Sequence, residues 1–198
     1  MMLHLGDTAL SRRSPGDLPR RGAGEPAANS MPHSAANDDA SSLPSPPVFK
    51  TLVLPVPRAL AFELFTRHAG RWWSPLVGAA VDDAPWLEIV LEAQQGGRWF
   101  ETDVTGAEHQ WGTVTECAPP ERIVVDWRLT RWTRGLSTEL ELCFIAIDDQ
   151  TTRVTLEHRM LGEAMPGQQE VRDAIQRGWT GLLPRFATLC ARVADRRQ

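Results

Sequence analysis

The stretch that decides the fold is GGRWFE at residues 96–101, followed by WGTV at 111–114 and PPERIVVDW at 119–127. Each segment carries a tryptophan, and glycine or proline residues punctuate the sequence around the segments. This pattern predicts three consecutive antiparallel strands joined by tight turns. Large aromatic side chains on strands with few nucleophiles nearby indicate a protein that encloses something rather than one that cleaves something.

Strand signals continue on both sides of this stretch. A period of two between apolar and polar residues predicts strands over 87–92, 98–104, 108–117, 123–130, 140–144 and 154–158, and a short apolar strand over 48–54. Strands of this kind bury one face and leave the other in water, as in an antiparallel meander.

Two helices are predicted, one on each side of the run of six strands. The first begins at Pro57, a residue suited to a first helical position, and ends near Gly70. The second begins at about Gly167 and carries an apolar stripe with spacings of three and four residues, with a kink expected at Pro184. The order of elements predicts an α+β domain in which a curved antiparallel sheet of about seven strands grips the long C-terminal helix.

The first 46 residues differ from the rest of the chain. They contain no Val, Ile, Phe, Trp or Lys, and 24 of the 46 are Ala, Ser, Pro or Gly. Such a segment buries too little apolar surface to offset the entropy lost on ordering. We therefore expect a disordered tail over 1–46 and one domain over 47–198. No apolar segment follows Arg12 and Arg13, so we expect no export signal, and Met31 is an alternative start of translation.

Composition narrows the classes of partner. The net charge is −4, and the arginines are scattered among acidic residues without a one-sided stripe, which argues against nucleic acid or an anionic membrane. No run of apolar residues is long enough to span a bilayer. Three widely separated cysteines, Cys117, Cys143 and Cys190, are typical of a reducing compartment. We expect a soluble, cytoplasmic protein.

Several chemistries lack the residues that they need. The only lysine, Lys50, is not part of a phosphate-binding loop, and the sequence has neither C-x-x-C nor H-E-x-x-H. Ser74 and Ser137, the only serines after residue 46, do not lie in a G-x-S-x-G elbow, and tyrosine is absent. We therefore expect no metal, no cofactor and no serine hydrolysis.

The order of elements and several short motifs together resemble the SRPBCC superfamily, the START-like, helix-grip group that includes the birch pollen allergen. The motifs are RWWSP at 71–75, the three segments quoted above, TRVTLEHR at 152–159 and Gly178-Trp179. Within the group, the chain is most similar to homologues of the C-terminal domain of the heat-shock protein 90 ATPase activator, over about residues 48–195. The resemblance implies a cavity between the sheet and the long helix that accepts an apolar or amphipathic molecule. The activator's separate chaperone-binding N-terminal domain has no counterpart in the short polar tail.

Candidate site residues follow from the strand and helix patterns. Tryptophans could line the cavity with apolar walls and orient a ligand through their indole N–H groups, or they could simply fill the core. Both alternatives also apply to Trp132. Trp72 and Trp73 would either cap the entrance or staple their loop to the sheet edge. The expected cavity residues are Trp99, Trp111, Trp127, Leu142, His158, Trp179, Leu183 and Phe186.

His158 is the single weak candidate for catalysis. It shares its strand parity with Val154 and Leu156, so its ring should point inward, where it could act as a general base or be satisfied by a neighbouring group. Glu101 and Glu157 are expected to point outward rather than to form an acid/base pair.

Three functions remain open from the sequence. The first is a protein without classical enzyme activity that binds a small hydrophobic molecule. The second is a cavity enzyme of the cyclase, dehydratase or hydrolase type with His158 as base. The third is a protein-interaction module associated with a chaperone.

Overall fold

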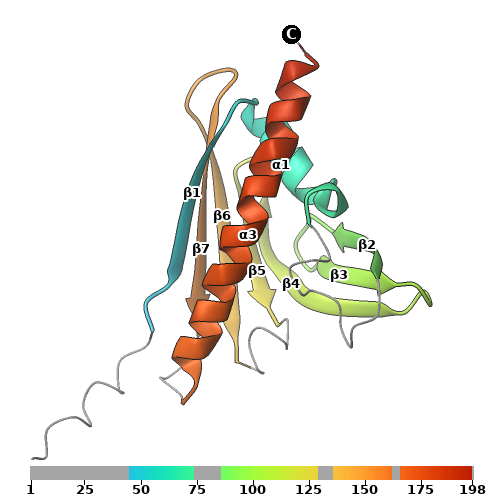
Figure 1. The fold of residues 1–198 in the computed structure, drawn as a ribbon, viewed down its shortest axis with the longest axis vertical. Helices are drawn as coiled ribbons and strands as arrows, with labels where there is room; N and C mark the ends of the chain where they lie inside the picture. The colour runs from blue at the N-terminus through green and yellow to red at the C-terminus, as the bar shows by residue number, and fades with distance from the viewer. Residues whose placement is uncertain (1–44, 74–85, 129–135, 162–165, 198) are drawn as a thin grey trace, which may run out of the picture. The chain divides into compact units, whose positions relative to one another are not determined.

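A single seven-stranded antiparallel sheet organises the chain, with strand order β1-β7-β6-β5-β4-β3-β2 (Figure 1). The structure is a computed structural model that describes residues 45–73, 86–128, 136–161 and 166–197. Its strands are β1 Val48–Leu54, β2 Trp86–Leu91, β3 Arg98–Asp103, β4 Glu108–Ala118, β5 Arg122–Trp127, β6 Thr138–Ala146 and β7 Thr152–Met160. Its helices are α1 Arg58–Thr66, the short 3₁₀ helix η2 Ala69–Arg71, and α3 Gln168–Asp195.

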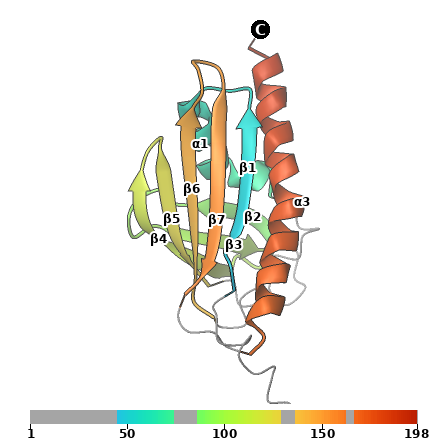
Figure 2. The same cartoon turned by 90° about the vertical axis from the view of Figure 1, so that its left-hand side faces the viewer.

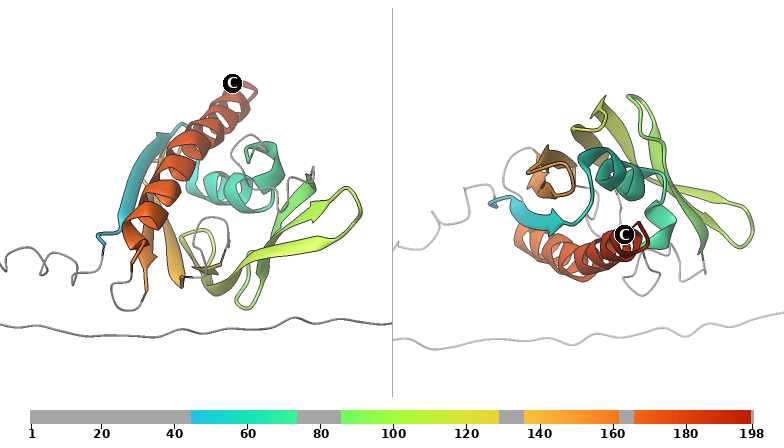
Figure 3. Two further views of the ribbon diagram at one scale, coloured as in Figure 1. Left: turned by 60° about the horizontal axis from the view of Figure 1, so that its bottom comes forward. Right: turned by 90° about the horizontal axis from the view of Figure 1, so that it is seen from above.

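The predicted α+β, helix-grip fold is confirmed. The sheet curls, and α3 runs along its open side, packed against β1 and β7 (Figures 1 and 2). Helix α1 lies within the curve and packs against β6 and α3, while η2 packs against β2 (Figure 3). Of the predicted tail over 1–46, residues 1–44 lie outside the described residues, as do Ser74 and Trp132.

Strands β6 and β7 alternate between buried and partly exposed residues, as the period of two predicts. Leu140, Leu142 and Phe144 face inward and are fully buried. On the opposite, convex face, Glu141 accepts a hydrogen bond of 2.6 Å from Nε of Arg122 and another from the guanidinium of Arg159. The alternation therefore divides each strand into a core face and a charged, hydrated face.

The first helix is shorter than predicted. It ends at Thr66, whose hydroxyl donates a hydrogen bond of 2.8 Å to the carbonyl of Phe62. The chain then turns through η2, and the backbone N–H groups of Trp72 and Trp73 both donate to the carbonyl of Ala69. This turn directs two tryptophans toward the interior. Helix α3 runs through Pro184 without ending there, and the kink expected at this residue stays a prediction.

Gly112 allows two strands to approach each other closely. It lies in register between Trp99 of β3 and Trp127 of β5, next to a β-bulge where β4 carries Trp111 as an extra residue. A Cβ atom at Gly112 would lie 2.6 Å from the backbone oxygen of Asp126, closer than real Cβ atoms come to such an atom. The bulge turns Trp111 inward although Gly112 also faces the core.

Candidate functional site

Aromatic side chains fill the space between the sheet and α3. We call this group the aromatic cluster. All its rings are buried, and the centroids of neighbouring rings lie at distances typical of aromatic contacts. Its members come from α1, the turn after η2, three strands and α3: Phe65, Trp72, Trp73, Trp99, Trp111, Trp127, Trp179 and Phe186.

Trp73 lies at the centre of the aromatic cluster. Its ring centroid is 5.0 Å from that of Trp111, 5.4 Å from that of Trp99 and 5.6 Å from that of Trp179. These three partners belong to β4, β3 and α3, whereas Trp73 lies two residues after the end of η2. The ring of Trp73 thus occupies the space between the walls that the sequence predicted for a ligand.

The other predicted cavity residues lie in the same core. Leu142 of β6 is fully buried, and Leu183 of α3 is nearly so. Phe186 packs edge to face on Phe65, with ring centroids 5.2 Å apart, and also contacts Trp72. The structure therefore brings the predicted residues together in one core.

His158 is fully buried and is bonded at both ring nitrogens. The indole N–H of Trp179 donates a hydrogen bond of 3.0 Å to Nδ1, so the proton of the neutral ring is on Nε2. Nε2 lies 3.0 Å from the hydroxyl oxygen of Thr138, and that hydroxyl donates a 2.9 Å bond to the carbonyl of Trp127. The result is a directed chain of hydrogen bonds across α3, β7, β6 and β5.

Burial lowers the pKa of His158 to about 3. The imidazolium is disfavoured because its charge would be removed from water, and the Trp179 N–H can only donate, so it opposes a proton on Nδ1. In this arrangement neither ring nitrogen is available to accept a proton from a bound molecule. The geometry is that of a histidine that ties the helix to the sheet.

Two other indole N–H groups of the aromatic cluster differ from that of Trp179. Nε1 of Trp99 and Nε1 of Trp111 are buried and meet no hydrogen-bond acceptor among the described residues. The indoles of Trp72 and Trp179, in contrast, donate to the carbonyl of Phe65 and to His158. Two hydrogen-bond donors are therefore held on the sheet side of the aromatic cluster.

The expectation that Glu101 points outward is wrong. Glu101 is 1% exposed and lies two residues after Trp99 on β3, on the same face of the strand. Its parity with Trp99 indicates the inward direction, whereas the general preference of carboxylates for water indicates the outward one. Glu157 does face outward, 3.6 Å from the guanidinium of Arg159.

A groove of about 300 Å³ opens on the surface beside Trp72 and Trp73. It runs between the end of η2 and the C-terminal half of α3. The residues that line it are Arg71, Trp72, Trp73, Arg185, Thr188, Leu189 and Arg192.

In the described part of the chain, no group of three or more His, Cys, Asp or Glu side chains could hold a metal ion. No described helix is both long and apolar enough to cross a membrane.

Sequence comparison places this core in a family. The family model described as "Activator of Hsp90 ATPase homolog 1-like protein" matches residues 55–191, a range that begins just after β1 and ends within the last turns of α3. The chain belongs to this family. The resemblance noted above is thus confirmed. No curated protein matches the chain.

Two of the solved structures that are similar to this chain share its fold. CalC from Micromonospora echinospora, a self-sacrificing resistance protein, is 26% identical, with a TM-score of 0.58 over 73% of this chain and 94% of that one. The Hsp90 activator PFC0360w from Plasmodium falciparum is 19% identical, with a TM-score of 0.51 over 73% of this chain and 96% of that one. The anthrahydroquino-γ-pyrone synthase Txn09 is 28% identical, with a TM-score of 0.49 over 73% and 97% of the two chains.

Proposed function

We propose that this protein binds a small hydrophobic or amphipathic molecule within the aromatic cluster, in the space that the ring of Trp73 occupies. The observation that carries the proposal is the pair of buried indole N–H groups on Trp99 and Trp111 without an acceptor among the described residues. A buried donor left unsatisfied costs about 1–3 kcal/mol. A carbonyl, ether or hydroxyl oxygen of a ligand would remove that penalty.

The position of Trp73 supports the same proposal. Its neighbours are fixed by strand pairing or by the helix, but Trp73 itself is held after a short 3₁₀ turn. Its ring can therefore leave with less disruption than a ring that is carried by a paired strand or by α3. A planar molecule that took its place would meet Trp99, Trp111 and Trp179 at the distances that Trp73 now has.

The test uses prodan, an uncharged planar naphthalene dye with a carbonyl acceptor. We expect Trp73→Ala to bind prodan more tightly than the native chain does, because the dye no longer has to displace an indole. In that background, Trp111→Phe should weaken binding by about fivefold, the value of one hydrogen bond of about 1 kcal/mol. Trp72→Phe is the matched control, since its N–H already donates to Phe65.

Two results would count against the proposal. One is the absence of prodan binding to both the native chain and the Trp73→Ala variant. The other is equal weakening by Trp111→Phe and Trp72→Phe. Near-ultraviolet circular dichroism of each variant would establish that the core remains packed, so that dye binding reports a site rather than unfolding.

A second function, interaction with a protein partner such as Hsp90, is favoured by a patch on the convex face. Phe49 and Val53 of β1 are each 60% exposed, and Val53 lies in register with Arg153 and then Ile145 across β7 and β6. Apolar side chains grouped on an exposed face often mark a protein contact. If this patch binds Hsp90, the native chain should stimulate its ATPase, and the Phe49→Asp, Val53→Asp variant should not.

A further inference from the structure

Three arginines converge on the groove beside the aromatic cluster. Arg185 and Arg192 are seven residues apart on α3 and therefore lie on one face of the helix, with Leu189 between them. Arg71 faces them from the end of η2. The groove is thus built by two elements that are far apart in the sequence.

Among the described residues, no carboxylate forms an ion pair with these guanidinium groups. Ion pairs in the described part of the chain involve other arginines, chiefly on the convex face of the sheet, and none of the three forms one. Acidic residues are absent from the described residues that line the groove. A chain with a net charge of −4 therefore carries a local concentration of positive charge at this place.

The floor of the groove is apolar and aromatic. Leu189, Trp72 and Trp73 supply it, and each is less than a tenth exposed. The hydroxyl of Thr188 is already engaged, because it donates to the carbonyl of Pro184. Three cationic donors above an aromatic floor match an anion joined to a flat apolar body, since guanidinium binds carboxylate, sulfonate or phosphate oxygens in a planar fork.

We infer that the molecule bound by this protein is an anionic, planar aromatic compound, and that Arg71, Arg185 and Arg192 recognise its charged group in this groove. The inference deepens the proposed function, since Trp73 borders both the groove and the aromatic cluster. The anionic group would lie in the groove, and the ring system would extend inward past Trp73. A groove of about 300 Å³ is the size of a small-molecule site.

A pair of dyes that differ in charge tests the inference. Anilinonaphthalene sulfonate is anionic, and N-phenyl-naphthylamine has the same ring system without the sulfonate. We expect the anionic dye to bind more tightly, and the Arg185→Gln, Arg192→Gln double variant to raise its Kd by about tenfold or more while leaving the Kd of the neutral dye unchanged. Added salt should weaken binding of the anionic dye alone.

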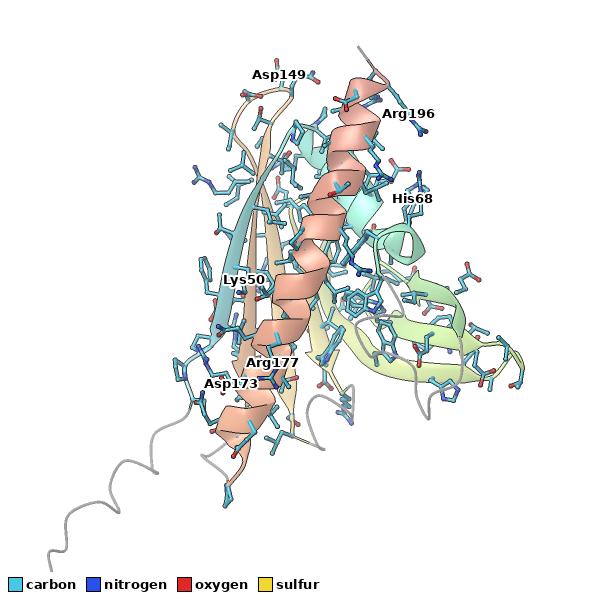
Figure 4. All side chains as sticks on the ribbon, in the orientation of Figure 1. Lys50, His68, Asp149, Asp173, Arg177 and Arg196 are labelled. Carbon is cyan, nitrogen blue, oxygen red and sulfur yellow. The ribbon has the colours of Figure 1, made fainter. Side chains whose placement is uncertain are left out.

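The control removes the same charge elsewhere. Arg177 on α3 and Arg153 on β7 are exposed, and Figure 4 shows Arg177 on the N-terminal half of the helix. If the Arg153→Gln, Arg177→Gln variant weakens the anionic dye as much as the groove variant does, the effect is one of net charge and the inference is overturned. Equal binding of the two dyes to the native chain overturns it as well.

The dye pair also separates this inference from the proposed function. If both dyes bind, if Trp73→Ala strengthens both, and if the groove variant changes neither, the interior site stands and the charge recognition does not. If the anionic dye depends on the arginines and Trp73→Ala has no effect on either dye, the groove binds anions on its own and the interior site fails.

Discussion

The rings of Trp99 and Trp127 meet edge to face, 5.0 Å between centroids, although a whole strand separates β3 from β5. Gly112 of the intervening strand makes the contact possible, because it lies in register with both tryptophans and has no side chain. The geometry is a favourable one for aromatic rings. The packing of the aromatic cluster therefore depends on a residue that contributes no ring.

Gly112→Ala should destabilise the protein by about 1–3 kcal/mol, the usual effect of an overpacked core position. The added methyl would meet backbone atoms of Asp126, which cannot rotate away. Urea unfolding measures the loss, and near-ultraviolet circular dichroism should show altered tryptophan packing. Gly70→Ala is the control, since its added methyl would be 3.7 Å from the nearest atom. A Gly112→Ala variant as stable as Gly70→Ala would contradict the prediction.

Acid should weaken the fold through His158. Its pKa is lowered to about 3 in the folded state, against 6.5 for an ordinary histidine. Between these values the unfolded chain binds the extra proton, so the free energy of unfolding is highest above pH 6.5 and falls as the pH drops toward 3. The slope for one such group is about 1 kcal/mol per pH unit. Unfolding at pH 7.5, 6 and 5 measures it.

Substitution identifies the group responsible for this slope. His158→Gln should lower stability at neutral pH and reduce the slope between pH 6.5 and 5; His68→Gln, at a partly buried residue, is the matched control. Asp103 titrates in a lower window, because hydrogen bonds from Thr105 and His109 hold its pKa below the usual range. A slope unchanged in His158→Gln would show that other groups cause the acid sensitivity.

Thr138→Val should lower the free energy of unfolding by about 1–3 kcal/mol, although the side chains of threonine and valine have nearly the same shape. The hydroxyl accepts from His158 and donates to the carbonyl of Trp127, and both partners are buried. Thermal or urea unfolding gives the difference. The same replacement at the exposed Thr51 of β1 should change stability by less than about 0.5 kcal/mol. Equal effects at the two positions would argue against the hydrogen-bond chain.

Tryptophan-to-phenylalanine replacements should fall into two classes. Trp179→Phe removes the donor to His158 and leaves Nδ1 buried without a partner, whereas Trp99→Phe removes an N–H that meets no acceptor among the described residues. We expect Trp179→Phe to be the more destabilising by about 1–3 kcal/mol. Urea unfolding at pH 7.5 compares the two. The reverse order would mean that the indole of Trp99 is satisfied in solution.

Regular periodicity explains which parts of the core could be predicted from the sequence. Trp127, Leu142 and His158 face inward because they lie on strands whose alternation is unbroken near them. The stripe of α3 likewise predicted Trp179 and Phe186 as buried residues. Local pattern and final structure agree at these positions because no tertiary contact opposes the pattern.

Trp111 and Trp73 show where such reasoning ends. The inward position of Trp111 depends on a bulge that arises from the pairing of β4 with β3, a contact between strands that the period of two does not contain. The central position of Trp73 follows from a short turn without any periodicity. Residue type and position in the chain suggest both as candidates, but long-range packing decides where their rings lie.

Lys50, the only lysine in the sequence, gives the domain a single reactive amine at a useful place. Its Nζ donates a hydrogen bond of 2.9 Å to the hydroxyl of Thr180, so the amine bridges the edge strand β1 and the long helix (Figure 4). Apart from the chain's α-amino group, an acylating fluorophore has this one point of attachment. A dye placed there would lie beside both helix and sheet, so its fluorescence would respond to a change in its surroundings when a ligand enters.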